Sequence, residues 1–442
     1  MSAAAQGTIR ERERSIDAYR AFAILTVIAG HWLAFVLLDD AGRLDGRNLL
    51  EIWPPAPWLT WFFQVMPLFF VVGGYANAAS WTGLRREVSR LGWVGARVWR
   101  LVVPSLVLLT VVTTVSMASR WAGADAATVD LALTIVGLPL WFLAVYLVVS
   151  ATTPWLVEAE QRWGLRVPAG LLATCVAVDL LANLGGVPIG LLTYPLFWLG
   201  VYAAGVAWRS GRLLEVPWLA PALVVGGAAA LVLLVVVGPY PVSMLAALGE
   251  EIQNNGPPSS ALLALAMAQL GIVLLLRHRV RRWCEHRRVW AGVVAVNLVA
   301  MSLYLWHMVA ALLASLVFWF TGLVSAAAAL STTWWWQRPL WYLVCAGMLL
   351  VIVRAVRRFE WVTPVVEPVP QTPRRLIGLG AGVTLLAAGM VALTVTGLTA
   401  GPAGISVLGL LAFVAGAVTV RAATGIVATT STRRTRAPSD LS

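Results

Sequence analysis

The first apolar segment, SIDAYRAFAILTVIAGHW, contains the residues best suited to chemistry. Ionisable side chains inside a bilayer are costly, so each one is a functional candidate. His31 follows Arg20 by eleven positions, which on an α-helix is three turns plus about 20°, so both residues share a face. Asp17 lies one turn before Arg20 on the same stripe. Because imidazole serves as a general base more often than other side chains, the pattern favours proton transfer at His31, with Arg20 as a positioning group.

A structural interpretation of this pair competes with the catalytic one. It makes Arg20 an anchor at the cytoplasmic membrane surface and gives His31 a hydrogen bond to a neighbouring helix. A rise of 1.5 Å per residue from Ser15 places His31 roughly 24 Å along the helix, in the middle or outer half of a membrane. The position inside the membrane favours the catalytic interpretation more strongly for His31 than for Arg20.

Two further sets of residues could take part in chemistry. His307 occurs in SLYLWHMV with Tyr304 one turn before it, about 20 Å into its own span and at a depth like that of His31. A Tyr/Trp/His cluster that only packs helices is the alternative. Arg97 and Arg100 lie three positions apart in ARVWR, and paired guanidinium groups suit phosphate. Attraction to anionic lipid headgroups explains these two arginines equally well.

Weaker candidates for a substrate channel are Gly74, Tyr75, Trp141, Glu250 and Glu251. The glycine allows close helix contact, the aromatic residues suit a membrane interface, and an ordinary solvated loop explains the two glutamates better than a site does. The spacing of the three cysteines suits neither zinc nor a disulfide framework. We therefore predict no metal site and no bound cofactor.

The amino-acid composition indicates which secondary-structure elements position these residues. Of the 442 residues, 60% are hydrophobic and 12% are charged, about half the charge of a typical soluble domain. The apolar residues form runs of about 20, the length that crosses a bilayer as a helix. The sequence predicts an all-α, polytopic bundle of about twelve transmembrane helices, near 15–38, 58–80, 98–118, 131–153, 169–184, 190–208, 218–238, 259–277, 293–320, 335–357, 376–397 and 403–422.

The arginines predict the orientation of the bundle. All 32 basic residues are arginine, and only four of them (Arg43, Arg47, Arg120 and Arg338) fall on the face opposite the rest. Because positive residues favour the cytoplasmic side, both termini are predicted to be cytoplasmic, in a bacterial inner membrane. The net charge of +12 is therefore attributed to membrane topology, and no nucleic-acid partner is expected. The two longest loops on the outer face are near 39–57 and 239–258.

Four further motifs follow the spacing of Asp17, Arg20 and His31 in a fixed order. They are FFVVGGY at 69–75, RVWR at 97–100 with Pro104, PLWFLAVY at 139–146 and SLYLWH at 302–307. In these elements the chain resembles the membrane acyltransferase-3 family of bacterial integral-membrane O-acyltransferases. The resemblance covers about 14–357, or ten spans, and departs from the family pattern at Gly73, where serine is common.

The resemblance implies that an acyl group, often acetyl, moves from acyl-CoA as co-substrate to a hydroxyl of a surface or secreted carbohydrate or another acceptor. The family's functional positions match Arg20, His31, Arg97 and Arg100. The expected partners are acyl-CoA, a hydroxylated acceptor such as a glycan, and membrane lipids. The expected organisation is a cytoplasmic segment (1–14), the acyltransferase-like membrane domain (15–357), a cytoplasmic linker (358–375), two extra helices (376–422) and a disordered tail (423–442).

A different class of function also fits twelve spans with both ends inside, namely a secondary transporter of a polar solute or glycan precursor. Such carriers often show two matching halves and helices broken at the midplane, and the two sets of six spans here do not resemble each other. A non-catalytic membrane subunit is the third possibility, and it leaves Arg20 and His31 unexplained.

Overall fold

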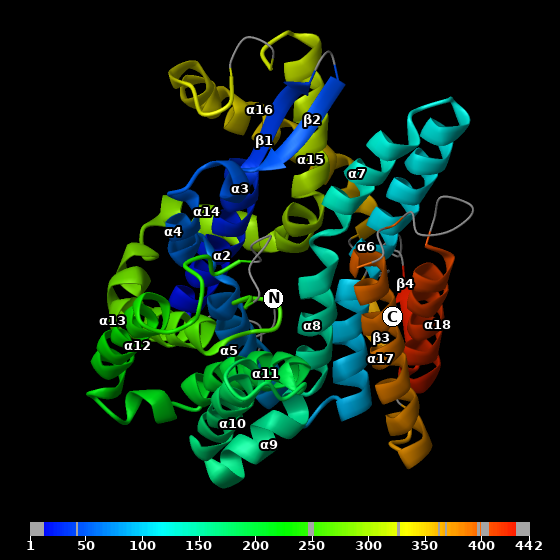
Figure 1. The fold of residues 1–442 in the computed structure, drawn as a ribbon. Helices are drawn as coiled ribbons and strands as arrows, with labels where there is room; N and C mark the ends of the chain where they lie inside the picture. The colour runs from blue at the N-terminus through cyan, green and yellow to red at the C-terminus, as the bar shows by residue number, and fades with distance from the viewer. Residues whose placement is uncertain are drawn as a thin grey trace, which may run out of the picture. The chain divides into compact units, whose positions relative to one another are not determined.

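A computed structural model describes residues 13–40, 43–245, 252–324, 328–360, 363–366, 369–395, 398 and 406–429. Over these residues the chain is almost entirely helical, which confirms the predicted all-α class (Figure 1). The helices are α2 (Arg14–Ala34), α3 (Leu49–Ile52), α4 (Ala56–Phe63), α5 (Met66–Leu84), α6 (Arg90–Trp121), α7 (Ala126–Gly137), α8 (Leu140–Ala151), α9 (Thr153–Trp163), α10 (Arg166–Asn183), α11 (Thr193–Arg209), α12 (Leu219–Val236), α13 (Ser260–Trp283), α14 (Arg287–Leu298), α15 (Ala300–Phe320), α16 (Thr332–Glu360), α17 (Pro373–Val395) and α18 (Val407–Thr424).

Two short antiparallel ladders and two 3-10 turns complete the regular structure of the described residues. β1 (Phe35–Asp40) pairs with β2 (Arg43–Asn48), and β3 (Thr363–Val366) pairs with β4 (Ile426–Thr429). The 3-10 turns are η1 (Gly190–Leu192) and η2 (Arg212–Leu214). Residues 1–12 of the predicted N-terminal segment and 430–442 of the predicted tail lie outside the described residues.

The number of candidate membrane spans is close to the predicted number of about twelve. Eleven helical segments of the described chain are long and apolar enough to cross a membrane. The more polar helix α2, which contains Asp17 and Arg20, corresponds to the first of the twelve predicted spans. Side-chain oxygens of Glu13, Ser89 and Ser259 accept backbone N–H groups at the starts of α2, α6 and α13.

Two boundaries differ from the sequence-based expectation. Helix α2 ends at Ala34 instead of 38, and the strands β1 and β2 take the place of the end of the predicted span and the first part of the expected loop. The apolar run Phe35–Leu38 continues the helical composition, and a short run of this kind does not distinguish helix from strand. The predicted span 293–320 is broken at Val299 between α14 and α15. His307 therefore lies seven residues, about 10 Å, from the start of α15, instead of the expected 20 Å.

The chain divides into two compact units. The first contains 1–80, 153–300 and 310–348, and the second contains 81–152, 301–309 and 349–442. In the first unit α12 packs along α13, and α10 packs along α11 (Figure 1). In the second unit α17 packs along both α18 and α8.

A pair of glycines brings α5 and α11 into backbone contact within the first unit. A Cβ atom added at Gly74 would lie 2.1 Å from the Tyr202 carbonyl oxygen, and one at Gly205 would lie 1.9 Å from the Val71 carbonyl oxygen. Small residues at helix crossings allow this close approach in membrane bundles. The structure thus gives Gly74 a role in helix packing.

The substitution Gly205→Ala should destabilise the protein, because the added methyl group overlaps a backbone carbonyl and the two helices must separate. The expected cost is about 1–3 kcal/mol, seen as a lower melting temperature of the purified protein in detergent. Gly83→Ala is the matched control, since nothing lies within 4 Å of the Cβ position at Gly83. Equal melting temperatures for the two variants would contradict the packing role.

Candidate functional site

The N-terminal part of α2 carries a buried polar network that joins it to α14. Arg20 Nη2 lies 3.4 Å from Asp17 Oδ1, and Arg20 Nε donates to Asn297 Oδ1 at 2.5 Å. The Asn297 amide in turn donates to the Asp17 main-chain carbonyl at 2.8 Å and to the Val293 carbonyl at 2.9 Å. The side chain of Asp17 is 10% exposed and that of Arg20 is 28% exposed. One carboxylate and one amide thus fix the guanidinium while part of it stays accessible.

Asn297 is a member of this network that the sequence analysis did not identify. It lies near the end of α14, in the apolar sequence GVVAVNLV. An isolated amide within an apolar run is a signal that could have identified it, because a polar group there needs an internal partner. The partner, however, lies on a helix 277 residues away in sequence, so its identity could not be inferred.

His31 lies on the same helix, three turns beyond Arg20, and is half-buried. Its Nδ1 atom lies 3.0 Å from the Val27 carbonyl oxygen of its own helix. A carbonyl oxygen only accepts hydrogen bonds, so this contact places the proton of the neutral ring on Nδ1. The ring then carries its lone pair on Nε2, the tautomer that a general base at Nε2 requires.

Aromatic residues surround the N-terminal half of α2 in the first unit. The rings of Tyr19 and Tyr75 both contact Trp208, with centroids 6.4 and 5.6 Å away. The Tyr19 hydroxyl donates to the Val273 carbonyl at 2.9 Å, and the Arg209 guanidinium lies 6.0 Å from the Tyr75 ring centroid. Tyr75, predicted as a channel residue, therefore belongs to an aromatic cluster that includes a second cation.

The second unit contains the other predicted histidine. His307 is fully buried on α15, and its Nδ1 lies 2.6 Å from the Tyr304 carbonyl oxygen. The Tyr304 hydroxyl donates to the Pro139 carbonyl at 3.1 Å, and its ring packs against Phe142. Trp141 contacts the other side of this group through Phe142, at 6.2 Å between ring centroids. Tyr304, His307 and Trp141 thus belong to one aromatic group, as the packing interpretation expects.

The second unit also contains a buried carboxylate that was not predicted from the sequence. Glu360, the last residue of α16, accepts hydrogen bonds from the Ser302 hydroxyl and from Trp306 Nε1, the latter at 2.8 Å. Ser302 and Trp306 flank Tyr304 along α15. Because Glu360 follows the basic residues Arg357 and Arg358, the sequence alone makes it look like a solvated residue.

The two predicted phosphate-binding arginines both lie on α6. Arg97 is half-buried with its guanidinium 5.3 Å from the Trp93 ring, and Arg100, one turn further, is exposed. A face with one half-buried and one exposed guanidinium can bind an anion such as phosphate. These arginines belong to the second unit, and Arg20 belongs to the first.

The outer loop that was predicted near 239–258 is tied to the first unit at both ends. The Tyr240 hydroxyl donates to the Asp179 carboxylate at 2.6 Å, and the Asn254 amide donates to the carbonyls of Pro241 and Ser243. Burial, together with the hydrogen bond to Asp179, raises the pKa of Tyr240, so the phenol remains a donor at neutral pH. The predicted channel residues Glu250 and Glu251 lie outside the described residues.

The sequence of the chain is similar to a known protein family. Residues 13–358 match the family model Acyl_transf_3, described as an acyltransferase domain. No curated protein and no solved structure matches the chain. Within the described ranges, no group of three or more His, Cys, Asp or Glu residues is arranged to hold a metal ion. Because the family model covers more than half of the chain and the helices suit a bilayer, the chain belongs to the acyltransferase-3 family and is a multi-pass membrane acyltransferase.

Proposed function

We propose that the protein transfers an acyl group, in the simplest case acetyl, from cytoplasmic acyl-CoA to a hydroxyl of a cell-surface or secreted carbohydrate. The proposal rests on the orientation and tautomer of the His31 ring on α2. Its Nδ1 contact to the Val27 carbonyl orients a neutral imidazole with the lone pair on Nε2. The Asp17–Arg20–Asn297 network at the other end of the same helix supplies a fixed cation.

The arginine distribution supports a cytoplasmic donor side. Acyl-CoA is made in the cytoplasm, and its phosphates require cations there. Arg97 and Arg100 follow the basic segment that contains Arg85, Arg86 and Arg90, which the positive-inside tendency places at the cytoplasmic surface. In this proposal the two α6 arginines hold the CoA phosphates, Arg20 assists, and the slender pantetheine arm carries the thioester into the bundle.

The proposed chemical step is a general-base-catalysed acyl transfer. The acceptor hydroxyl oxygen attacks the thioester carbonyl carbon while His31 Nε2 takes the hydroxyl proton. The tetrahedral intermediate collapses, the C–S bond breaks, and the CoA thiolate leaves and takes the proton from the imidazolium. An ester and free CoA are the products. A covalent acyl-histidine is a less economical route, because it needs two transfers where one suffices.

Replacing His31 with alanine should abolish acyl transfer while leaving the fold intact. General-base catalysis contributes typically about 10²–10⁴-fold, so the rate of transfer from acyl-CoA should fall by at least that factor. The rate is measured with purified protein as release of CoA thiol. His278→Ala is the matched control, because His278 is exposed near the end of α13. Full activity of the His31 variant at an unchanged melting temperature would remove the basis of the mechanism.

Replacing Arg97 or Arg100 with alanine should raise the apparent KM for acyl-CoA. Each loss removes a cation from the phosphate-binding group, and a contact equal in ground and transition state changes KM with little change in kcat. The expected rise is about 10- to 150-fold, since a charge-assisted hydrogen bond contributes roughly 1.5–3 kcal/mol. Arg166→Ala, an exposed arginine at the start of α10, is the control. If the variants alter only the use of the acceptor, the phosphate assignment is wrong.

A further inference from the structure

His31 lies in the last turn of α2, the part of a helix that its own hydrogen bonds hold least. The last carbonyl groups of an α-helix have no N–H partner one turn further along, so the end frays unless other donors bind them. The Phe35 N–H binds the His31 carbonyl, and the chain then leaves the helix for β1. In an apolar bundle the carbonyls around this end need donors from elsewhere in the protein.

Side chains of α16 donate hydrogen bonds to three main-chain oxygens of the α2–β1 segment, on both sides of His31. The three bonds are Tyr342 Oη to the Ala29 carbonyl at 2.7 Å, Trp341 Nε1 to the Trp32 carbonyl at 3.0 Å and Arg338 Nη2 to the Phe35 carbonyl at 3.0 Å. The donors are three and four positions apart along α16, so they lie on one face of that helix. This face of α16 therefore caps the C-terminal end of α2.

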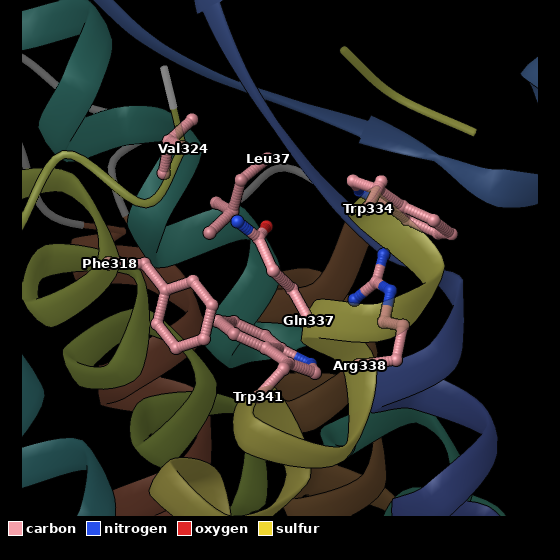
Figure 2. A pocket seen from close by; sticks show the side chains of 7 residues that line it. All are labelled: Leu37, Phe318, Val324, Trp334, Gln337, Arg338 and Trp341. Atoms are coloured by element: carbon pink, nitrogen blue, oxygen red, sulfur yellow. The ribbon is translucent and has the colours of Figure 1, made fainter. Parts of the chain in front are cut away.

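The capping role explains why a charged residue, Arg338, is buried here. It is 9% exposed, and its guanidinium carbon lies 3.6 Å from the Trp334 ring centroid and 5.9 Å from that of Trp341 (Figure 2). Within the part of the chain that the structure describes, no carboxylate lies within ion-pair distance of Arg338. The C-terminal end of a helix carries a partial negative charge, and cations near it bind the last carbonyls. The end of α2 and the two ring faces thus stabilise the guanidinium.

Ring contacts and a close approach hold the same turn of α2 within the first unit. The ring contacts join Tyr342 to Trp32 at 6.0 Å and Trp341 to Phe35 at 6.1 Å between centroids. From α4, Phe63 packs directly against Gly30, where an added Cβ atom would lie 2.9 Å from the Phe63 Cδ1 atom. The turn that carries His31 is therefore held by both α16 and α4.

We propose that Arg338, Trp341 and Tyr342 are positioning residues for His31, which keep its helical turn closed and its ring in place. The His31 Nδ1 atom contacts the Val27 carbonyl one turn earlier, so the tautomer depends on this turn remaining helical. The catalytic consequence rests on the proposed function, in which Nε2 takes the proton of the acceptor hydroxyl. A displacement of a catalytic group by about 1 Å can lower a rate about 100-fold.

The kinetic test uses the full-length protein in detergent and two substitutions on α16. Arg338→Met removes the charge and the donors, and it should lower kcat for acyl transfer by about 10- to 100-fold. Tyr342→Phe removes only the hydroxyl, and the loss of one neutral hydrogen bond should lower kcat by about 2- to 10-fold. The KM for acyl-CoA should stay unchanged in both variants, because neither touches the donor site. Arg338→Lys, which keeps a charged donor, should recover most of the rate.

Two comparisons separate positioning from a general loss of stability. Gln337→Met is the matched control, because the Gln337 amide donates to the Leu323 carbonyl at 3.2 Å and this bond does not involve α2. This variant should keep the kcat of the unmodified protein. In a His31→Ala background, Arg338→Met and Tyr342→Phe should cause no further loss, because they act through the imidazole.

Nitrogen NMR of the histidine-labelled protein reports the His31 ring directly and requires no activity. The chain has four histidines, and His31→Ala assigns the signal. We expect one tautomer, protonated at Nδ1, in the unmodified protein and in Gln337→Met, and a mixture in Arg338→Met. An unchanged tautomer in Arg338→Met, or rate losses that add to that of His31→Ala, would overturn the proposal. Absence of acyl transfer by the unmodified protein would instead refute the proposed function, and the NMR signal would still decide whether α16 holds the ring.

Discussion

Burying polar and ionisable side chains in an apolar bundle requires partners within the protein, and this constraint determines how α2 is held. At its N-terminal end Arg14 donates to the Cys284 carbonyl at 3.0 Å, and Asn297 bridges Arg20 and the Asp17 main chain. At its C-terminal end α16 donates hydrogen bonds to the carbonyls of three residues. The proposed base is thus on a helix tied at both ends, a rigid element rather than a mobile loop. Catalytic groups held this way keep their geometry more accurately than groups on loops.

The same constraint gives the two ends of α2 different surroundings. The end with Asp17, Arg20 and Asn297 carries the accessible cation, and the far end is bonded to side chains of α16, among them Arg338. Arg338 is also one of the four arginines that the sequence places on the face opposite the basic loops. The proposed acyl transfer gives the imidazole within this membrane helix the role of a general base.

Much of the fold could be predicted from the sequence. The thickness of the bilayer determines the length of a spanning helix, and its hydrocarbon interior requires apolar side chains. The helical class was read from composition, and the common face of Asp17 and Arg20, which lie 3.4 Å apart in the structure, from their one-turn spacing. Asn297 could not be paired with Arg20, because a contact across 277 residues has no local signature. The start of β1 at Phe35 and the break at Val299 were missed because the apolar composition continues through both.

The surroundings of Arg338 could not be predicted from the sequence for a similar reason. Arg338 stood out only by its side of the membrane, while its stacking on Trp334 and its contact with Phe35 join segments about 300 residues apart. For His31 the sequence predicted a depth and a helix face. The Nδ1 contact with Val27, which selects the tautomer, is a detail of side-chain conformation that spacing does not supply.

Transfer of an acyl group from acyl-CoA to a hydroxyl is the activity that we propose for this membrane protein. The most direct measurement incubates the purified chain, reconstituted in liposomes, with acetyl-CoA labelled in the acetyl group and a glycan extract from the cells that express it. We expect release of CoA thiol together with an equal amount of alkali-labile label on the glycan, both dependent on the protein. Uptake of glycan or solute without cleavage of the thioester would contradict the proposed activity.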